Sequence, residues 1–200
     1  MFPVIQAGKP LKNAQKAIIL LHGRGGSAED ILSLGGELAD ENSCLLAPQA
    51  SQGTWYPRSF LAERQENEPF LSQSIEQVDR LIQETSQTIS LNHIALVGFS
   101  QGACLALEVA ARNPRPYLCV AAFTGGLIGK MLPSYNGDFQ QTPIFIGCGD
   151  HDPHVPLQRC EESKAILISL NANVLLKVYP NRSHTISFDE IENVRFLLNR

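Results

Sequence analysis

The chain has 200 residues, of which 44% are hydrophobic and 18% are charged. It is long enough to bury a substantial core, and we expect a single domain over residues 1–200. The formal net charge of −4 offers no basic field for a phosphate backbone. This argues against a nucleic-acid partner and gives no sign of a strongly anionic substrate.

The N-terminal segment "MFPVIQAGKP" lacks the basic, apolar and cleavage regions of a secretory signal. No run approaches the roughly 20 apolar residues that a membrane helix needs. The five cysteines form an odd set without a Cys-x-x-Cys pair, and most lie in apolar runs: Cys44, Cys104, Cys119, Cys148 and Cys160. We therefore expect reduced, buried thiols in a cytoplasmic protein without an integral membrane segment.

Apolar runs of strand length alternate with amphipathic stretches of helix length along the whole chain. In chain order, we expect strand 16–21, helix 27–42, strand 44–48, helix 69–90, strand 93–99, helix 103–113, strands 117–123 and 143–147, helix 156–171, strand 173–179 and helix 187–200. Capping-box patterns begin two of these helices, at Ser27 and Ser187. The alternation predicts an α/β fold with a mainly parallel sheet and helices on both faces.

The segment "LVGFSQGA" places Gly98, Ser100 and Gly102 in a G-x-S-x-G pattern, directly between an expected strand and an expected helix. A nucleophile elbow needs this context, because it holds a serine in a strained turn where flanking side chains would clash. The alternative is a turn of small residues without catalytic meaning. The strand before the motif and the helix after it favour Ser100 as a nucleophile.

A catalytic serine needs a histidine base that is oriented by a carboxylate. In this architecture the three residues follow the chain order Ser, Asp or Glu, His. His184 lies between the last strand and the last helix, where the base is expected. His22 and His93 precede Ser100, and His93 begins its strand at the end opposite the elbow. The sequence therefore favours His184.

The carboxylate is expected in "GCGDHDPHVP", residues 147–156, where Asp150 and Asp152 are both available. His151, Asp152 and His154 are also chemically plausible metal ligands. No further cluster of ligand residues completes such a site, so we expect neither a metal nor a cofactor. His151 and His154 receive no role from the sequence.

The segment "LLHGRGGSAED" follows the first expected strand and contains Arg24. Acyl transfer builds negative charge on the carbonyl oxygen, which fixed backbone N–H groups stabilise. In this architecture the donors come from the first strand-to-helix loop and from the residue after the nucleophile. We expect the backbone amides of Arg24 and Gln101 to form this oxyanion hole. The alternative is a glycine-rich turn that serves chain geometry alone.

Taken together, these segments resemble the phospholipase/carboxylesterase family of α/β-hydrolases, which includes bacterial carboxylesterases and acyl-protein thioesterases. The resemblance rests on "LHGRGGSAEDIL", "WYPRSF", "GFSQGA", "GCGDHDPHVP" and "SHTIS", in order over nearly the whole chain. It implies an α/β-hydrolase fold, with Ser100 as nucleophile, His184 as base and Asp152 as the acid. The chain reads "HGRGG" where the thioesterases read "HGLGD", so it is more similar to the bacterial esterase branch.

No cap domain is expected, because the segment 124–141 is too short to form one. The loop 51–69 is the main segment available to shape the site. Candidate pocket residues are Trp55 and Phe60, for both of which core packing is an equally good interpretation. Leu127 and Met131 are weaker candidates. Arg58 is expected to pair with a nearby acid.

These features predict a serine hydrolase that cleaves carboxylic esters through an acyl-enzyme on Ser100. Thioesters and lysophospholipids are further candidate substrates, and the partner is a small molecule. Two alternatives share the fold: an acyltransferase with the same triad, and a non-catalytic ligand-binding homologue. Acyl chain length, leaving group and oligomeric state are not determined by the sequence.

Overall fold

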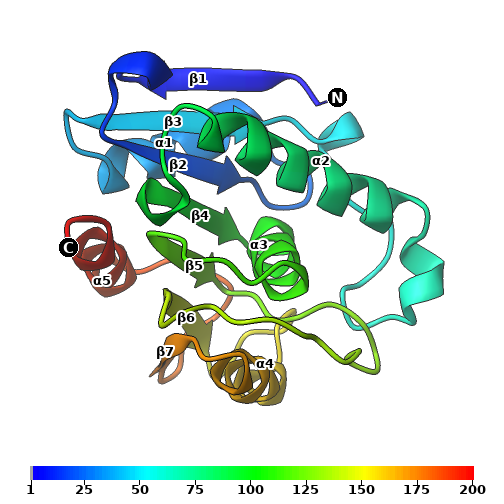
Figure 1. The fold of residues 1–200 in the computed structure, drawn as a ribbon. Helices are drawn as coiled ribbons and strands as arrows, with labels where there is room; N and C mark the ends of the chain where they lie inside the picture. The colour runs from blue at the N-terminus through cyan, green and yellow to red at the C-terminus, as the bar shows by residue number, and fades with distance from the viewer. Residues whose placement is uncertain (1) are drawn as a thin grey trace.

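A computed structural model describes residues 2–200. Seven strands form one sheet in the order β1-β3-β2-β4-β5-β6-β7 (Figure 1). They span Val4–Gly8 (β1), Lys16–Leu21 (β2), Ser43–Pro48 (β3), Ile94–Phe99 (β4), Cys119–Phe123 (β5), Pro143–Gly149 (β6) and Asn173–Tyr179 (β7). All neighbouring pairs are parallel except β1 with β3. The predicted α/β class is confirmed.

The edge strand β1 is the one strand that the sequence does not predict. It pairs antiparallel with β3, with Val4 opposite Pro48 and Gly8 opposite Cys44. Its residues alternate between exposed and half-buried, whereas β2 and β3 are almost continuously buried. A short edge strand that is half exposed to solvent lacks the apolar run by which the other strands are predicted. β1 forms by pairing with the free edge of β3.

Five helices cover the two faces of the sheet: α1 (Ala28–Leu38), α2 (Phe70–Ser86), α3 (Gln101–Arg112), α4 (Leu157–Ser169) and α5 (Phe188–Leu198). α2, α3 and α4 lie on one face, while α1 and α5 lie on the other (Figure 1). α3 begins two residues earlier than predicted. Both predicted capping boxes are present: Ser27 accepts from the Asp30 amide, and Ser187 accepts from the Glu190 amide.

The core consists of two apolar layers, one on each face of the sheet. The central strands carry apolar residues toward both layers, which explains why they read as unbroken hydrophobic runs. The five cysteines are unpaired and buried. Burial raises the pKa of the Cys104 and Cys119 thiols to about 12, so both stay protonated and weakly reactive at neutral pH.

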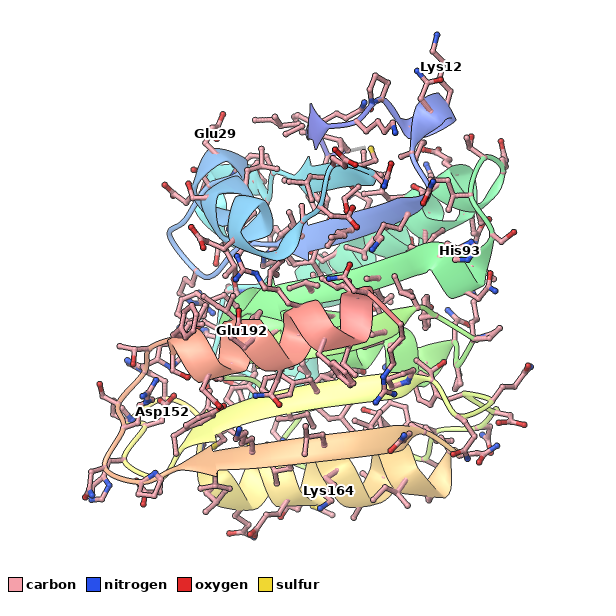
Figure 2. The ribbon with its side chains drawn as sticks, turned by 90° about the vertical axis from the view of Figure 1, so that its left-hand side faces the viewer. Lys12, Glu29, His93, Asp152, Lys164 and Glu192 are labelled. Carbon is pink, nitrogen blue, oxygen red and sulfur yellow. The ribbon has the colours of Figure 1, made fainter. Side chains whose placement is uncertain are left out.

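The parallel strands bring their carboxyl ends to a common edge of the sheet. Figure 2 shows Asp152, which follows β6, at this edge, and His93, which precedes β4, at the opposite one. His93 is therefore remote from any site built at the carboxyl ends. Among residues 2–200, no helix is both long enough and apolar enough to cross a membrane.

Phe145 is fully buried in the layer under α1 and α5. We expect Phe145→Ala to lower the free energy of unfolding by about 3–5 kcal/mol, because it removes apolar contacts and leaves a cavity. The matched control is Phe196→Ala in α5, where the ring is 64% exposed and the expected change is within about 0.5 kcal/mol. Urea unfolding followed by circular dichroism measures both, and equal losses would contradict this description of the core.

Candidate active site

Ser100 lies in a strained turn between β4 and α3. Its backbone has φ 55° and ψ −117°, a region that L residues rarely occupy. A Cβ atom on Gly98 would lie 2.3 Å from the Gly102 carbonyl oxygen, and one on Gly102 would lie 2.0 Å from the Leu21 carbonyl oxygen. Both glycines are thus required by close backbone approach, as a nucleophile elbow demands.

The structure brings Ser100, His184 and Asp152 into one hydrogen-bonded chain. His184 Nε2 lies 2.8 Å from Ser100 Oγ, and His184 Nδ1 lies 2.7 Å from Asp152 Oδ2. A carboxylate only accepts, so Nδ1 carries the proton and Nε2 is left to accept from the serine hydroxyl. The arrangement can therefore remove a proton from Ser100 and stabilise the resulting imidazolium.

Asp152 is held for this contact from two directions. Its side chain is fully buried, and its second oxygen accepts from the amides of His154 (2.8 Å) and Val155 (3.1 Å). Asp150 instead binds His151 and the Asn181 amide near the surface. The His151 hydrogen bond lowers the pKa of Asp150. Of the two aspartates in this loop, Asp152, the one that the family resemblance implied, is the one in contact with His184.

The two remaining histidines of this loop lie outside the hydrogen-bonded chain. The His154 ring packs edge-on against His184, with centroids 4.9 Å apart, and Phe99 packs against the same ring at 5.3 Å. His151 is exposed beside Asp150. Within residues 2–200, no group of three or more His, Cys, Asp or Glu side chains could hold a metal ion.

Arg24 and Gln101, the two residues expected to supply oxyanion-hole amides, both line the cavity that Ser100 faces. Gln101 is the first residue of α3, so its amide is free of the helix's own hydrogen bonds. Arg24 lines the same cavity as Ser100 and Gln101. Two such donors beside a nucleophile can stabilise an oxyanion.

The side chains of these two residues have a second task that the sequence did not reveal. Gln101 accepts from the Trp55 amide (3.0 Å) and donates to the Tyr56 carbonyl (2.8 Å). The Arg24 guanidinium donates to the carbonyls of Pro57 (2.9 Å) and Arg58 (2.6 Å). Both side chains thus hold the loop 54–58, which forms part of the cavity wall.

His22 supports the loop that carries Arg24. The sequence had only excluded it as the catalytic base. Its Nε2 accepts from the Ala50 amide (3.2 Å), so Nδ1 carries the proton and donates to the Gly23 carbonyl (2.7 Å). Burial lowers the pKa of His22, which keeps the ring neutral in this tautomer. The Trp55 indole N–H donates to the His22 carbonyl (2.8 Å).

A cavity of about 460 Å³ opens in front of Ser100. Phe60 lines it, together with Phe99, Val155 and the two histidines His154 and His184. The other candidate pocket residues do not line it. Trp55 and Leu127 are buried in the core, and Met131 is 80% exposed. Core packing is therefore the right interpretation for Trp55 and Leu127.

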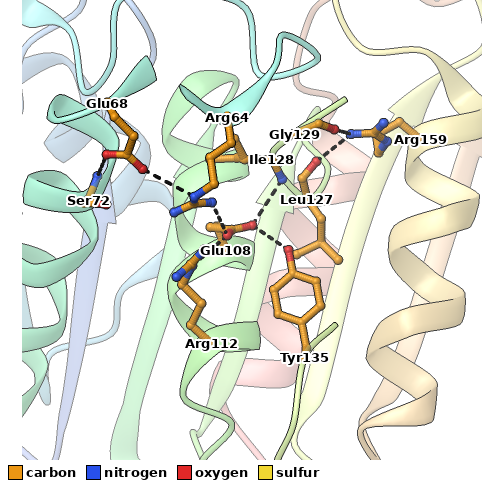
Figure 3. A network of polar contacts seen from close by, with 10 residues as sticks. All are labelled: Arg64, Glu68, Ser72, Glu108, Arg112, Leu127, Ile128, Gly129, Tyr135 and Arg159. Carbon is orange, nitrogen blue, oxygen red and sulfur yellow. Dashed lines mark hydrogen bonds and ion pairs between the residues drawn. The ribbon is translucent and has the colours of Figure 1, made fainter. Parts of the chain in front are cut away.

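A buried carboxylate organises the segments behind this cavity (Figure 3). Glu108 in α3 is fully buried and accepts from Arg64 (3.0 Å), Arg112 (2.8 Å), the Tyr135 hydroxyl (2.8 Å) and the Ile128 amide (3.2 Å). It therefore joins the segment after Phe60 to the segment after β5.

Arg159 in α4 completes this support (Figure 3). Its guanidinium donates to the carbonyls of Leu127 (3.0 Å) and Gly129 (2.6 Å). The Gly129 amide in turn donates to the Phe60 carbonyl (2.7 Å). The position of the Phe60 ring in the cavity wall thus depends on two buried charged residues whose sequence positions showed no sign of a functional site.

The sheet is mainly parallel and has no separate cap among the described residues. A strained serine turn follows the central strand β4, and a Ser-His-Asp chain lies at the carboxyl edge of the sheet. Together these features define an α/β-hydrolase. Comparison with known proteins agrees. The phospholipase/carboxylesterase family matches residues 3–199, and the chain belongs to this family. The resemblance inferred from the sequence is confirmed.

Individual relatives support this placement. A crystal structure of a phospholipase/carboxylesterase from Dyadobacter fermentans is 47% identical, with a TM-score of 0.96 over 100% of this chain and 97% of that one. Acyl-protein thioesterase 1 of Saccharomyces cerevisiae is 30% identical over 64% of this chain and 58% of its own length. The Bacillus subtilis protein MhqD is 28% identical over 91% and 92%. The matches span about half the length of the first thioesterase relatives.

We expect Glu108→Gln to lower the free energy of unfolding by about 3 kcal/mol, since it leaves two arginines without their buried counter-charge. Glu161→Gln, an exposed position in α4, makes the same chemical change and should have little effect. Chemical unfolding measures both. If the two variants were equally stable, the Glu108 network would not be what holds these segments.

Proposed function

We propose that this protein is a serine hydrolase that cleaves small-molecule carboxylic esters through an acyl-enzyme on Ser100. One observation carries the proposal: the hydrogen-bonded chain from Asp152 through His184 to Ser100 ends at a cavity of about 460 Å³. That volume falls within the range of small-molecule sites. Membership of the phospholipase/carboxylesterase family supports the same reaction class.

In the first half of the proposed reaction, Ser100 Oγ bonds to the acyl carbon while His184 Nε2 takes the hydroxyl proton. The amides of Arg24 and Gln101 stabilise the oxyanion that forms, and Asp152 stabilises the imidazolium. The intermediate collapses when the bond to the leaving oxygen breaks and His184 gives its proton to that oxygen. An alcohol departs, and the acyl group stays on Ser100.

In the second half, water enters and His184 takes one of its protons as the water oxygen attacks the acyl-enzyme. Collapse returns the proton to Ser100 and releases the carboxylic acid. His184 thus acts as a base at the start of each half and as an acid at its end. The reaction needs no cofactor.

Phe60, Phe99 and Val155 give the cavity an apolar surface, which suits an acyl or aryl group of modest size. Thioesters would react by the same steps, and the similarity to a yeast thioesterase keeps them as a second substrate class. That similarity covers only part of each chain. Simple esters are therefore the first choice.

We expect Ser100→Ala to abolish hydrolysis of aryl acetates and to prevent covalent labelling by a fluorophosphonate probe. The wild-type protein should lose activity in step with labelling, because the probe phosphonylates an activated serine hydroxyl. Intact-mass spectrometry measures the labelling, with circular dichroism to show that the variant is folded. A folded wild-type protein that stays unlabelled would refute the proposed mechanism.

The two aspartates give a second test. We expect Asp152→Asn to reduce kcat by roughly 10³-fold or more, since an amide at this position no longer favours the working tautomer of His184. Asp150→Asn, at an exposed site two residues earlier, is the matched control and should change kcat little. Steady-state kinetics on one aryl ester compares them. A larger loss in Asp150→Asn would reverse the assignment.

A further inference from the structure

The cavity in front of Ser100 is locally basic, although the chain has a net charge of −4. Its lining residues include Arg24 and Arg58 but no aspartate or glutamate. Asp152 does not line the cavity. Its carboxylate accepts hydrogen bonds from the His184 ring and from two backbone amides. A ligand in the cavity therefore meets positive groups without intervening acids.

Arg58 differs from the other arginines around this wall. The Arg24 guanidinium is occupied by Thr54 and by two loop carbonyls, and the Arg64 guanidinium binds Glu108 and Glu68. The Arg58 guanidinium has no hydrogen-bond or ion-pair partner among residues 2–200. The expected pairing of Arg58 with a nearby acid is thus not found, and its donors are free for a ligand.

The backbone of Arg58 is nevertheless fixed. Its amide donates to Asn67 Oδ1 (2.7 Å), and its carbonyl accepts from Arg24 (2.6 Å). Asn67 is fully buried and also donates to the Ser59 carbonyl (3.0 Å). Binding a ligand would therefore order only the side chain, since the backbone is already in place.

We propose that Arg58 is a specificity-determining residue that binds a carboxylate carried by the ester substrate. This inference rests on the proposed function and names its substrate class: esters with a free carboxylate near the scissile bond, such as monoesters of short dicarboxylic acids. A guanidinium presents paired N–H donors that match the two oxygens of a carboxylate. The carboxylate would lie at the Arg58 side of the cavity while the ester carbonyl lies at Ser100.

The test compares kcat/KM for matched pairs of aryl esters, with the uncatalysed rate subtracted. In one pair the acyl group is glutarate or its neutral methyl ester. In the other, the acyl group is acetate and the aryl leaving group carries either a carboxylate or its methyl ester. We expect the wild-type protein to favour the charged member of one pair by about fivefold or more. The pair that shows the preference tells whether the carboxylate that Arg58 binds belongs to the acyl group or to the leaving group of the substrate.

Arg58→Gln should bring the charged-to-neutral ratio of kcat/KM close to one. Arg58→Lys should keep part of the preference, because it retains the charge without the planar donor pair. The control is Arg80→Gln in α2, which is exposed and outside the cavity and removes the same charge. Its ratio should match that of the wild type. Added salt should weaken the preference in the wild type.

Three results would overturn this inference: no charge preference in a wild-type protein that hydrolyses neutral esters, an undiminished preference in Arg58→Gln, or an equal loss in Arg80→Gln. The last would indicate a general charge effect. Failure of the proposed function is distinguishable, because the wild-type protein would then hydrolyse none of the four esters and resist the fluorophosphonate probe. That outcome would overturn both proposals.

Discussion

The close crossing of β4 and α3 is the constraint on which the site depends. It leaves no room for a side chain at Gly98, and the end of β2 at Leu21 leaves none at Gly102. The turn between them holds Ser100 at a positive φ, at a cost of about 1–3 kcal/mol. The surrounding structure offsets this strain, since the Ser100 amide bonds the Phe123 carbonyl of β5 at 2.9 Å and α3 is buried along most of its length. The serine oxygen is consequently lifted beyond the strand ends, within reach of His184.

Side chains around this turn hold the neighbouring loops in place. The side chains of Arg24 and Gln101 hold the loop opposite Ser100, while their backbone amides are the proposed oxyanion donors. Behind this loop, Glu108 accepts from the Ile128 amide and Arg159 donates to the Gly129 carbonyl, so both fix the segment after β5 (Figure 3). Each of these side chains has hydrogen-bond partners, whereas the Arg58 guanidinium has none among residues 2–200.

Much of the fold could be predicted from the sequence because its signals are local. Central strands covered on both faces must be apolar throughout, and helices covered on one face must repeat their apolar residues with a helical period. β1 was not predicted, because its residues alternate between exposed and half-buried and form no apolar run. Trp55 and Leu127 could not be assigned in advance, since an apolar side chain suits a core and a pocket equally well.

By itself the sequence determined the α/β class and the order of its main elements, because apolar runs and helical periods are properties of neighbouring residues. It also singled out Ser100, from its place between a strand and a helix, and His184, from its place along the chain, as the candidate nucleophile and base. For Asp152 the family resemblance already implied the acid, and the structure shows it in contact with His184. Only the tertiary structure decided that Phe60 alone of the four apolar candidates lines the cavity, and that Arg58 has no acidic partner among residues 2–200. Those outcomes depend on where side chains point once distant strands and loops are packed together. Residues two positions apart in one loop then lie in different surroundings, one buried against a ring and the other open to solvent.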